Sequence, residues 1–441
     1  MILPYKLDTT NDKLTSRAGL LTIAELMESL QLSERIDKHF PLPNSNRGFM
    51  PSAFVQTLML MLHEGSFHLD DVRHLQEDDA LTSVLGFETI PKASTLGAWL
   101  RRAGNNKETF TGLREVNKAI LSSALHHRKS ITLDIDATEI VSAKSDAKWT
   151  YNKNQGYMPM VGHIAETGQV VACEFRDGNA APAKENLEFI EKCQQSLPEN
   201  CFIQALRIDS AGYQTKIIQH CDENAISYAI RAKMSTLLRE HINSLKQGAW
   251  KPFVSKEGKD ISDQDTYRTT HCIGNYDKAF TLIIQRTRIK GQAELDFNSE
   301  GPSEEIVSGD YIYRAIATNQ DGWTDSQIIH WYNQRGEDSE NRIKELKSDF
   351  GGDTLPCSDF NANALYFSFT AFAYNLFALM RQLLPEELAH HRAMTIRWRL
   401  YAMAAKVVKT SRQLYVKLQS KNQQLLESVL EALRRLEPPP I

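Results

Sequence analysis

The feature that most constrains the fold of this chain is a change of hydrophobic period near residue 130. Residues 131–140 read ITLDIDATEI, in which β-branched and polar residues alternate as in a β-strand. Residues 1–128 instead have apolar residues at helical spacing, with Pro51 and Gly65 placed to begin and end one helix. The sequence therefore predicts a helical amino-terminal region followed by a sheet.

Strand-like and helix-like segments alternate after this point. MPMVGHIAE and QVVACEF follow as strands, and FIQALRID and ISYAIRAK are strands separated by helical segments. This order predicts an α/β fold, a mixed sheet with flanking helices. We expect five segments: a helical DNA-binding and assembly domain (1–128), the first part of the core (129–233), a β-rich insertion (234–308), the second part of the core (309–382) and a basic helical carboxy-terminal region (383–441).

A local positive charge is hidden by the formal net charge of −4. Residues 388–426 contain no Asp or Glu, and their amphipathic pattern indicates a basic helical surface. Such a surface favours a polyanion as partner, and a solvated helix face is the other interpretation. The cations of this stretch are Arg392, Arg397, Arg399, Lys406, Lys409, Arg412, Lys417 and Lys421.

Several classes of protein are excluded. The six cysteines include no CxxC pair, which excludes a thiolate zinc site and a disulfide scaffold and fits a reducing cytosol. The first residues lack a signal-peptide pattern, so we expect a cytoplasmic protein. The apolar segment 364–380 is shorter than about 20 residues and contains Ser368 and Asn375, which predicts a buried helix and no membrane contact.

Acidic residues occupy two strand positions where acids are rare. Asp136 lies within an apolar strand and Asp209 ends another; alone, Asp209 would be read as a helix cap. The acid-rich helical segment 331–350 adds further carboxylates. Carboxylates without His or Cys favour Mg²⁺ or Mn²⁺, and two such ions about 4 Å apart can activate and stabilise the oxygens of a phosphodiester. Together with the basic stretch, this predicts phosphodiester chemistry on nucleic acid.

Three segments in order resemble the signature boxes of bacterial insertion-sequence DDE transposases, in the branch with a Tyr-Arg-Glu-Lys motif and a β-strand insertion. These segments are DIDAT (134–138), RIDSAGY (207–213) and YNQRGEDSENRIKELK (332–347). Further segments are similar to the insertion-sequence thirteen-eighty family: NKNQGYMPMVGH (152–163), FRDGN (175–179) and YAMAAKVVKTSRQLYVKL (401–418). The resemblance spans almost the whole chain and implies an RNase H-like core.

The resemblance also implies roles for single residues. Asp136, Asp209 and Glu340 match the catalytic residues that hold two Mg²⁺ or Mn²⁺ ions. Asp134 lies on the same strand face as Asp136, because strand side chains repeat every two residues, and is either a reserve ligand or an acid that hydrogen-bonds within the site. The residues matched to, or placed beside, the DNA-contacting members are Tyr332, Arg335, Lys344 and Lys347. Packing, ion-pair and surface roles are also open for Tyr332, Arg335 and Lys347.

One spacing departs from the family pattern. Four residues separate Arg335 from Glu340, where the family has three. On an unbroken helix the two side chains would point about 140° apart, so we predict a break or π-bulge at 336–339. Glu337 and Glu345 are the competing acids, expected to be dispensable for cleavage.

The sequence as a whole predicts a cut-and-paste DNA transposase. Its partners would be double-stranded DNA, both terminal inverted repeats and target, and a second copy of the chain in a homodimer associated with the nucleoid. Two alternatives are open: a metal-dependent nuclease of the same fold without strand transfer, and a catalytically silent DNA-binding protein. Trp250, Trp323 and Trp331 are more typical of packing than of base stacking.

Overall fold

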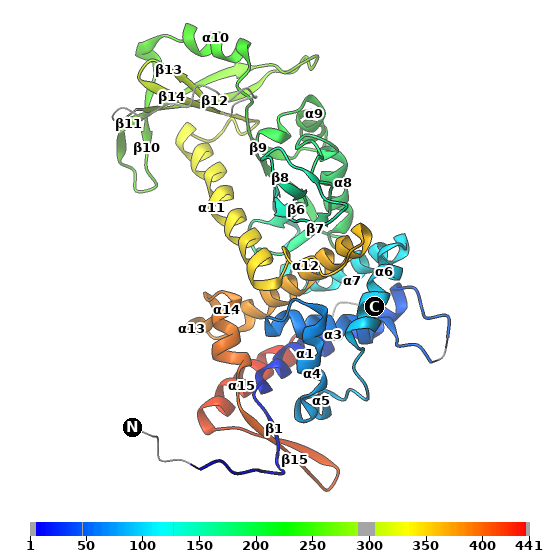
Figure 1. The fold of residues 1–441 in the computed structure, drawn as a ribbon. Helices are drawn as coiled ribbons and strands as arrows, with labels where there is room; N and C mark the ends of the chain where they lie inside the picture. Colours follow the sequence, from blue (N-terminus) through cyan, green and yellow to red (C-terminus); the bar gives the residue numbers. More distant parts are fainter. Residues whose placement is uncertain (1–5, 46, 127, 290–304, 438–441) are drawn as a thin grey trace. The chain divides into compact units, whose positions relative to one another are not determined.

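The computed structural model describes residues 6–45, 47–126, 128–289 and 305–437, and only the backbone of residues 337 and 338. The chain forms two compact units (Figure 1). We call His127–Ala143 with Ala147–Ile343 the core unit, and Met1–His126, Lys144–Asp146 and Lys344–Ile441 the helical unit. The five-segment division stays a prediction.

Within its described residues, the core unit contains a ten-stranded mixed sheet in the order β10-β11-β12-β14-β9-β8-β2-β6-β7, with β13 paired to β14. Its strands are β2 (Ser130–Ala137), β6 (Met160–Ile164), β7 (Val170–Glu174), β8 (Phe202–Ile208), β9 (Ser227–Arg231), β10 (Lys251–Val254), β11 (Asp260–His271), β12 (Phe280–Arg288), β13 (Ile306–Ser308) and β14 (Tyr311–Thr318). β2, β8 and β9 run parallel, and the other pairings are antiparallel. The predicted mixed α/β sheet with flanking helices is confirmed.

The insertion extends this sheet, because β12 pairs with β14 and β11 and β10 follow outward. A second, small sheet contains β3 (Ile140–Val141), β4 (Lys148–Trp149) and β5 (Gln155–Tyr157). The helices of the core unit are α8 (Asn186–Ser196), η3 (Ser210–Gly212), α9 (Thr215–Glu223), α10 (Thr236–Ser244), η4 (Gln247–Ala249) and α11 (Asp325–Phe350), whose residues from Lys344 on belong to the helical unit.

The two faces of the sheet are covered by different helices, with α11 on one side and α8 and α9 on the other in Figure 1. A Cβ added to Gly162 would meet Phe189 and Cys193 of α8, so this face lies against α8. The first half of α11 buries Ile328, Ile329 and Tyr332 among residues of β9, β10, β12 and β14. Burial of this apolar stripe fixes α11 across the face that carries the acids of β2.

The helical unit is built mainly from helices, as predicted, and Pro51 and Gly65 begin and end one of them. Its elements are β1 (Lys13–Thr15), η1 (Ala18–Leu20), α1 (Leu21–Ser29), α2 (Leu32–His39), α3 (Pro51–Glu64), η2 (Leu69–Val72), α4 (Arg73–Gln76), α5 (Asp79–Leu85), α6 (Ala93–Gly104), α7 (Lys107–Leu125), α12 (Phe360–Leu383), α13 (Glu386–Ala389), α14 (Ala393–Ile396), the π-helical η5 (Arg397–Tyr401), β15 (Ala405–Thr410), β16 (Gln413–Lys417) and α15 (Ser420–Arg434).

Helix α12 carries the apolar segment that could be mistaken for a membrane span. Between Ala362 and Met380 every residue except Ser368 is buried, as predicted for a core helix. In the described ranges, no helix combines the length and the apolar character needed to cross a membrane.

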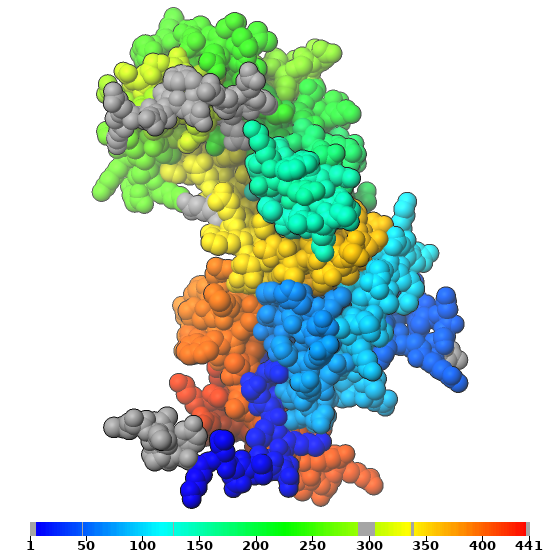
Figure 2. Space-filling model, viewed as in Figure 1, coloured from blue at the N-terminus to red at the C-terminus, as the bar shows by residue number. Residues whose placement is uncertain are grey.

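The prediction of a wholly helical basic region is wrong, because residues 405–417 form the β-hairpin β15–β16, joined to β1. Figure 2 shows this hairpin in orange beside the blue amino-terminal segment. Val407, Val408 and Val416 give the segment β-propensity, and Ser411 and Arg412 make the turn with positive φ.

Candidate active site

The carboxylates of Asp136 and Asp209 are brought to one edge of the sheet by the parallel pairing of β2 and β8. Ile135 pairs with Ile208, so the two aspartates occupy the next positions of the same ladder. Asp209 also caps η3, since its Oδ1 accepts a hydrogen bond of 3.0 Å from the Ala211 amide. The capping role considered for Asp209 and its place beside Asp136 are therefore both present.

Arg335 reaches this edge from α11. Its Nη2 lies 3.2 Å from Oδ1 of Asp136, and its Nε and Nη2 donate to the Ile135 carbonyl over 3.3 and 3.0 Å. The guanidinium is buried, while 22% of the Asp136 side chain is exposed. A buried cation bound to a main-chain carbonyl is held in place, and here it faces the candidate ligand.

Electrostatics link Glu340 to the same site. Burial raises the pKa of Asp136 to about 6; Arg335 opposes this rise, and the negative charges of Asp209 and Glu340 add to it. Glu340 itself is exposed on α11. Two acids that disfavour the charge of a third are typical of a site for a cation.

The predicted break at 336–339 is wrong, because α11 is a regular α-helix from Asp325 to Phe350. Tyr332, Arg335 and Ser339 do form one buried stripe, and Glu340 lies outside it. The long arginine side chain reaches Asp136 from its stripe, so no interruption is needed to bring both groups to the site. The side chain of Glu337 lies outside the described part of the structure.

Asp134 is no reserve ligand. Both of its oxygens accept from Arg207, over 2.7 Å to Nε and 2.7 Å to Nη2, and it is fully buried. Arg207 also donates to the Trp331 carbonyl over 2.6 Å, which ties α11 to the sheet. The sequence analysis did not identify Arg207. The available signal was its position two residues before Asp209, which matches the position of Asp134 two residues before Asp136.

The donors fit a hard cation only in part. Oxygen-only ligands with mutual repulsion suit Mg²⁺ or Mn²⁺. Among the described residues, however, no three His, Cys, Asp or Glu side chains gather closely enough to hold a metal ion. Asp136 instead pairs with Arg335, a cation of the chain itself.

Of the predicted DNA contacts on α11, only part is available to a ligand. Tyr332 is 6% exposed, packs in the apolar cluster and has the Arg231 guanidinium 4.8 Å from its ring, which favours the packing role. Lys344 is exposed and Lys347 is half-buried.

The arginines before the hairpin are engaged within the helical unit. Arg397 donates to the carbonyls of His63, Leu62 and Asp349, which removes it from the predicted DNA contacts. Arg392 bonds Asp349 over 2.8 Å, and Arg399 lies 2.9 Å from Nε2 of His391. These bonds join the ends of helices, a structural role that the charge pattern does not reveal.

The cations of the hairpin are more available. Lys409, Arg412 and Lys417 are exposed, whereas Lys406 pairs with Asp12 over 2.8 Å. Lys406 and Lys417 are direct cross-strand neighbours. Like charges placed opposite each other destabilise a hairpin, and here the Asp12 carboxylate offsets the charge of Lys406.

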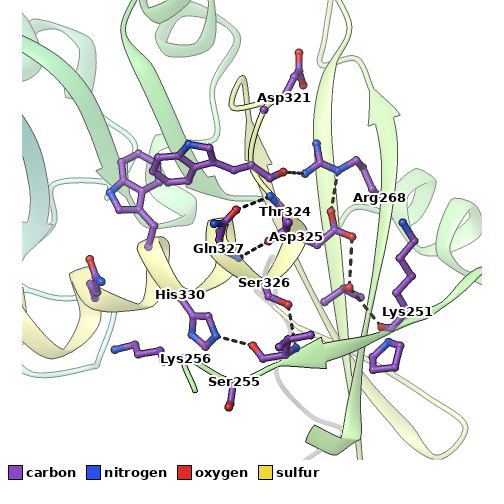
Figure 3. A pocket seen from close by; sticks show the side chains of 17 residues that line it. Lys251, Ser255, Lys256, Arg268, Asp321, Thr324, Asp325, Ser326, Gln327 and His330 are labelled. Carbon is purple, nitrogen blue, oxygen red and sulfur yellow. Dashed lines mark hydrogen bonds and ion pairs between the residues drawn. The ribbon is translucent and has the colours of Figure 1, made fainter. Parts of the chain in front are cut away.

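A groove of about 960 Å³ lies beside the first turns of α11, and Figure 3 shows its lining. Trp323 and Trp331 meet there edge to face, with ring centres 5.4 Å apart, and Trp323 is 38% exposed. Arg268 binds Asp325 over 2.8 Å at the rim. Trp250 lies outside the groove lining and packs against Tyr267 and the Arg286 guanidinium.

The mixed sheet thus carries acids at the carboxyl ends of β2 and β8, and α11 carries a third acid. The chain belongs to the family described as Transposase DDE domain group 1, which matches residues 4–438. A comparison with curated proteins found no match. Among solved structures, the chain is similar to a piggyBac transposase synaptic complex with hairpin DNA, at 12% identity and a TM-score of 0.44, over 96% of this chain and 82% of that one.

Proposed function

We propose that this member of the DDE transposase family is a cut-and-paste transposase of the insertion-sequence thirteen-eighty type, in the Tyr-Arg-Glu-Lys branch. It hydrolyses a phosphodiester bond at each transposon end, and the freed 3′-hydroxyl then attacks a phosphodiester of target DNA. The observation that carries the proposal is that Asp136 and Asp209 end adjacent parallel strands and that Nη2 of Arg335, from α11, lies 3.2 Å from Oδ1 of Asp136.

Asp136, Asp209 and Glu340 would hold the two Mg²⁺ or Mn²⁺ ions. When bound, such ions activate the attacking oxygen and stabilise the leaving oxygen. The chain's own residues orient the site: the Ala211 amide fixes Asp209, and the Ile135 carbonyl fixes Arg335. A fixed cation at this place favours the negative charge of a phosphate.

The hairpin cations Lys409, Arg412 and Lys417 would bind phosphates of the terminal inverted repeats, together with Lys344 and Lys347 of α11. These repeats and the target are double-stranded DNA. A symmetric homodimer would pair the two ends, because two-fold symmetry matches two inverted repeats. Transposition would take place on the nucleoid, in the cytoplasm.

Incubation of the full chain with the DNA that flanks its reading frame tests the proposal. With Mg²⁺, we expect nicks at the outer ends of the inverted repeats, and joined products when pre-cleaved ends are supplied. Cleavage without joining would identify a nuclease of the same fold. Binding without cleavage would identify a catalytically silent DNA-binding protein, and either result contradicts the proposal.

A further inference from the structure

Residues 148–154, which we call the aromatic loop, comprise β4 and the turn that leads into β5. Partial burial raises the pKa of Tyr151, and the negative charges of Glu139, Asp209 and Asp136 add to this rise. Tyr151 therefore shares the electrostatic surroundings of the candidate active site, although no signature box contains it.

Glu139 fixes the shape of this loop. Its carboxylate accepts from the hydroxyl of Thr150 and from the side-chain amides of Asn152 and Asn154, over 3.2 and 3.1 Å. Glu139 follows Asp136 by only three residues, a span of at most about 10 Å. The Thr150 amide also donates to the Asn154 carbonyl over 2.8 Å.

Two glycines allow close backbone contacts at the aromatic loop and at β5, which follows it. A Cβ on Gly156 would lie 2.0 Å from the Ile140 carbonyl oxygen, and one on Gly178 would lie 2.3 Å from that of Lys148. No side chain fits either position. Gly156 and Gly178 belong to the segments NKNQGY and FRDGN, to which the proposed catalysis gives no role. Both segments therefore help to fix the position of the aromatic loop.

The fixed loop displays two aromatic rings and two cations. Trp149 is 67% exposed and Tyr151 is 64% exposed. Lys148 and Lys153 are also exposed. Single exposed aromatics are ordinary, but two of them within three residues, immobilised and flanked by lysines, form a surface for a ligand that is both flat and anionic.

We propose that the aromatic loop binds the unpaired nucleotides next to the phosphodiester that the carboxylates process, with Trp149 and Tyr151 stacking on bases and Lys148 and Lys153 contacting phosphates. The position of the nucleotides beside the processed phosphodiester rests on the proposed function. The binding of unpaired nucleotides by the aromatic loop does not. Stacking requires an exposed base face, which duplex DNA hides, so the ligand is single-stranded or locally melted DNA.

Fluorescence anisotropy with the full chain tests the inference in EDTA, which prevents cleavage. The probe is a labelled single strand of about 12 nucleotides, within the ~4–16 that single-strand sites cover, and its annealed duplex is the comparison. Trp149→Ala/Tyr151→Ala should weaken single-strand binding roughly tenfold or more and duplex binding much less. Trp149→Phe/Tyr151→Phe keeps the rings and should restore most of the affinity.

Two further variants make the result specific. Phe202→Ala removes an aromatic that is 53% exposed at the start of β8, the opposite end of the strand from Asp209, and should change nothing. Lys148→Gln/Lys153→Gln should lower the salt slope by about 0.7 for each lost phosphate contact.

Unchanged single-strand binding by the Trp149→Ala/Tyr151→Ala variant would overturn the inference. So would an equal loss in Phe202→Ala, or a loss in Trp323→Ala alone, which would place the bases in the groove of Figure 3. These binding results do not depend on cleavage, so failure of the proposed function is recognised separately, by the absence of nicks with Mg²⁺.

Discussion

Arg335 joins α11 to the end of β2, since its guanidinium lies 3.2 Å from the Asp136 carboxylate and also donates to the Ile135 carbonyl. The same helix carries Glu340, whose charge acts on Asp136. One helix thus brings both an acid and a compensating cation to the aspartate. The cation offsets part of the repulsion that Asp209 and Glu340 exert on the charge of Asp136.

Asp136→Asn and Asp209→Asn should each abolish Mg²⁺-dependent cleavage while DNA binding stays close to that of the parent and both variants stay folded. Each change removes a negative oxygen ligand but keeps the side-chain volume, and the carboxamide introduced at position 209 retains an oxygen that can accept from the Ala211 amide. Gel assays of cleavage and binding, with thermal melts, check this. Near-normal cutting by either variant would show that the residue is not a ligand.

The stability of the metal-free protein should depend on pH through Asp136. Its pKa rises from 3.8 to about 6 on folding, chiefly because the carboxyl is buried, so the folded state holds the proton more tightly. The resulting stability is present below about pH 4 and is lost as the pH rises through about 6.

Asp136→Asn has no such titration, so its stability relative to the parent should increase between about pH 4 and pH 7, by up to about 3 kcal/mol. Urea unfolding in EDTA at several pH values measures the difference. A constant difference between the two proteins across this range would contradict the assignment.

Asp134 and Arg207 should behave as a buried ion pair. Asp134→Asn leaves the buried guanidinium without its counter-charge and should destabilise the core unit by about 3–5 kcal/mol, whereas Asp134→Leu/Arg207→Met should recover most of that loss. Arg314→Ala removes one partner of the exposed pair with Glu305, and the expected change is at most about 1 kcal/mol. Denaturant unfolding distinguishes these cases; a small effect of Asp134→Asn would mean that the pair does not tie the sheet together.

The sequence predicted the sheet and its two aspartates because both depend on local pattern. Alternation of apolar and polar residues over about eight positions is enough to predict a strand. Acids are rare in such strands, so Asp136 in β2 and Asp209 directly after β8 are easy to single out. The partner of Asp134 could not be predicted, because it depends on the register of two strands that are distant along the chain.

The errors have related physical causes. The predicted break in α11 assumed that Arg335 and Glu340 must share a stripe, but an arginine side chain is long enough to cross from one stripe to the next. The prediction of a helix over 405–417 is wrong because it rested on the lysines and arginines of the segment. Its valines, which favour strands, are few and were given no weight. Exposure of Trp149 and Tyr151 is a tertiary property and leaves no trace in the sequence pattern.

The hairpin should supply a salt-sensitive part of DNA affinity. Replacing Lys409, Arg412 and Lys417 by Gln should weaken duplex binding for all sequences and lower the salt slope by about 0.9 for each lost contact. Lys92, Arg102 and Lys107, exposed cations of α6 and α7 and their flanks, are the matched control set. An equal effect of both sets would indicate only a general charge effect, and no change of slope would mean that the hairpin face is merely solvated.

Glu340 should be the third acid required for cleavage, and Glu345 is its matched control. The charge of Glu340 acts on Asp136, and its side chain is exposed on α11. Glu345, one and a half turns further along the helix, is 5% exposed and accepts from the Ala393 amide over 3.0 Å and from Arg381 over 3.4 Å. Glu345 is therefore engaged in packing within the helical unit.

Glu340→Gln should be inactive with nearly unchanged stability, because an exposed carboxylate contributes little to packing. Glu345→Gln keeps an oxygen for Ala393 but weakens the Arg381 pair, so it should retain cleavage and lose about 1 kcal/mol of stability. Cleavage rates measured beside thermal melts separate the two effects. An active Glu340→Gln enzyme with an inactive but folded Glu345→Gln enzyme would transfer the assignment to Glu345.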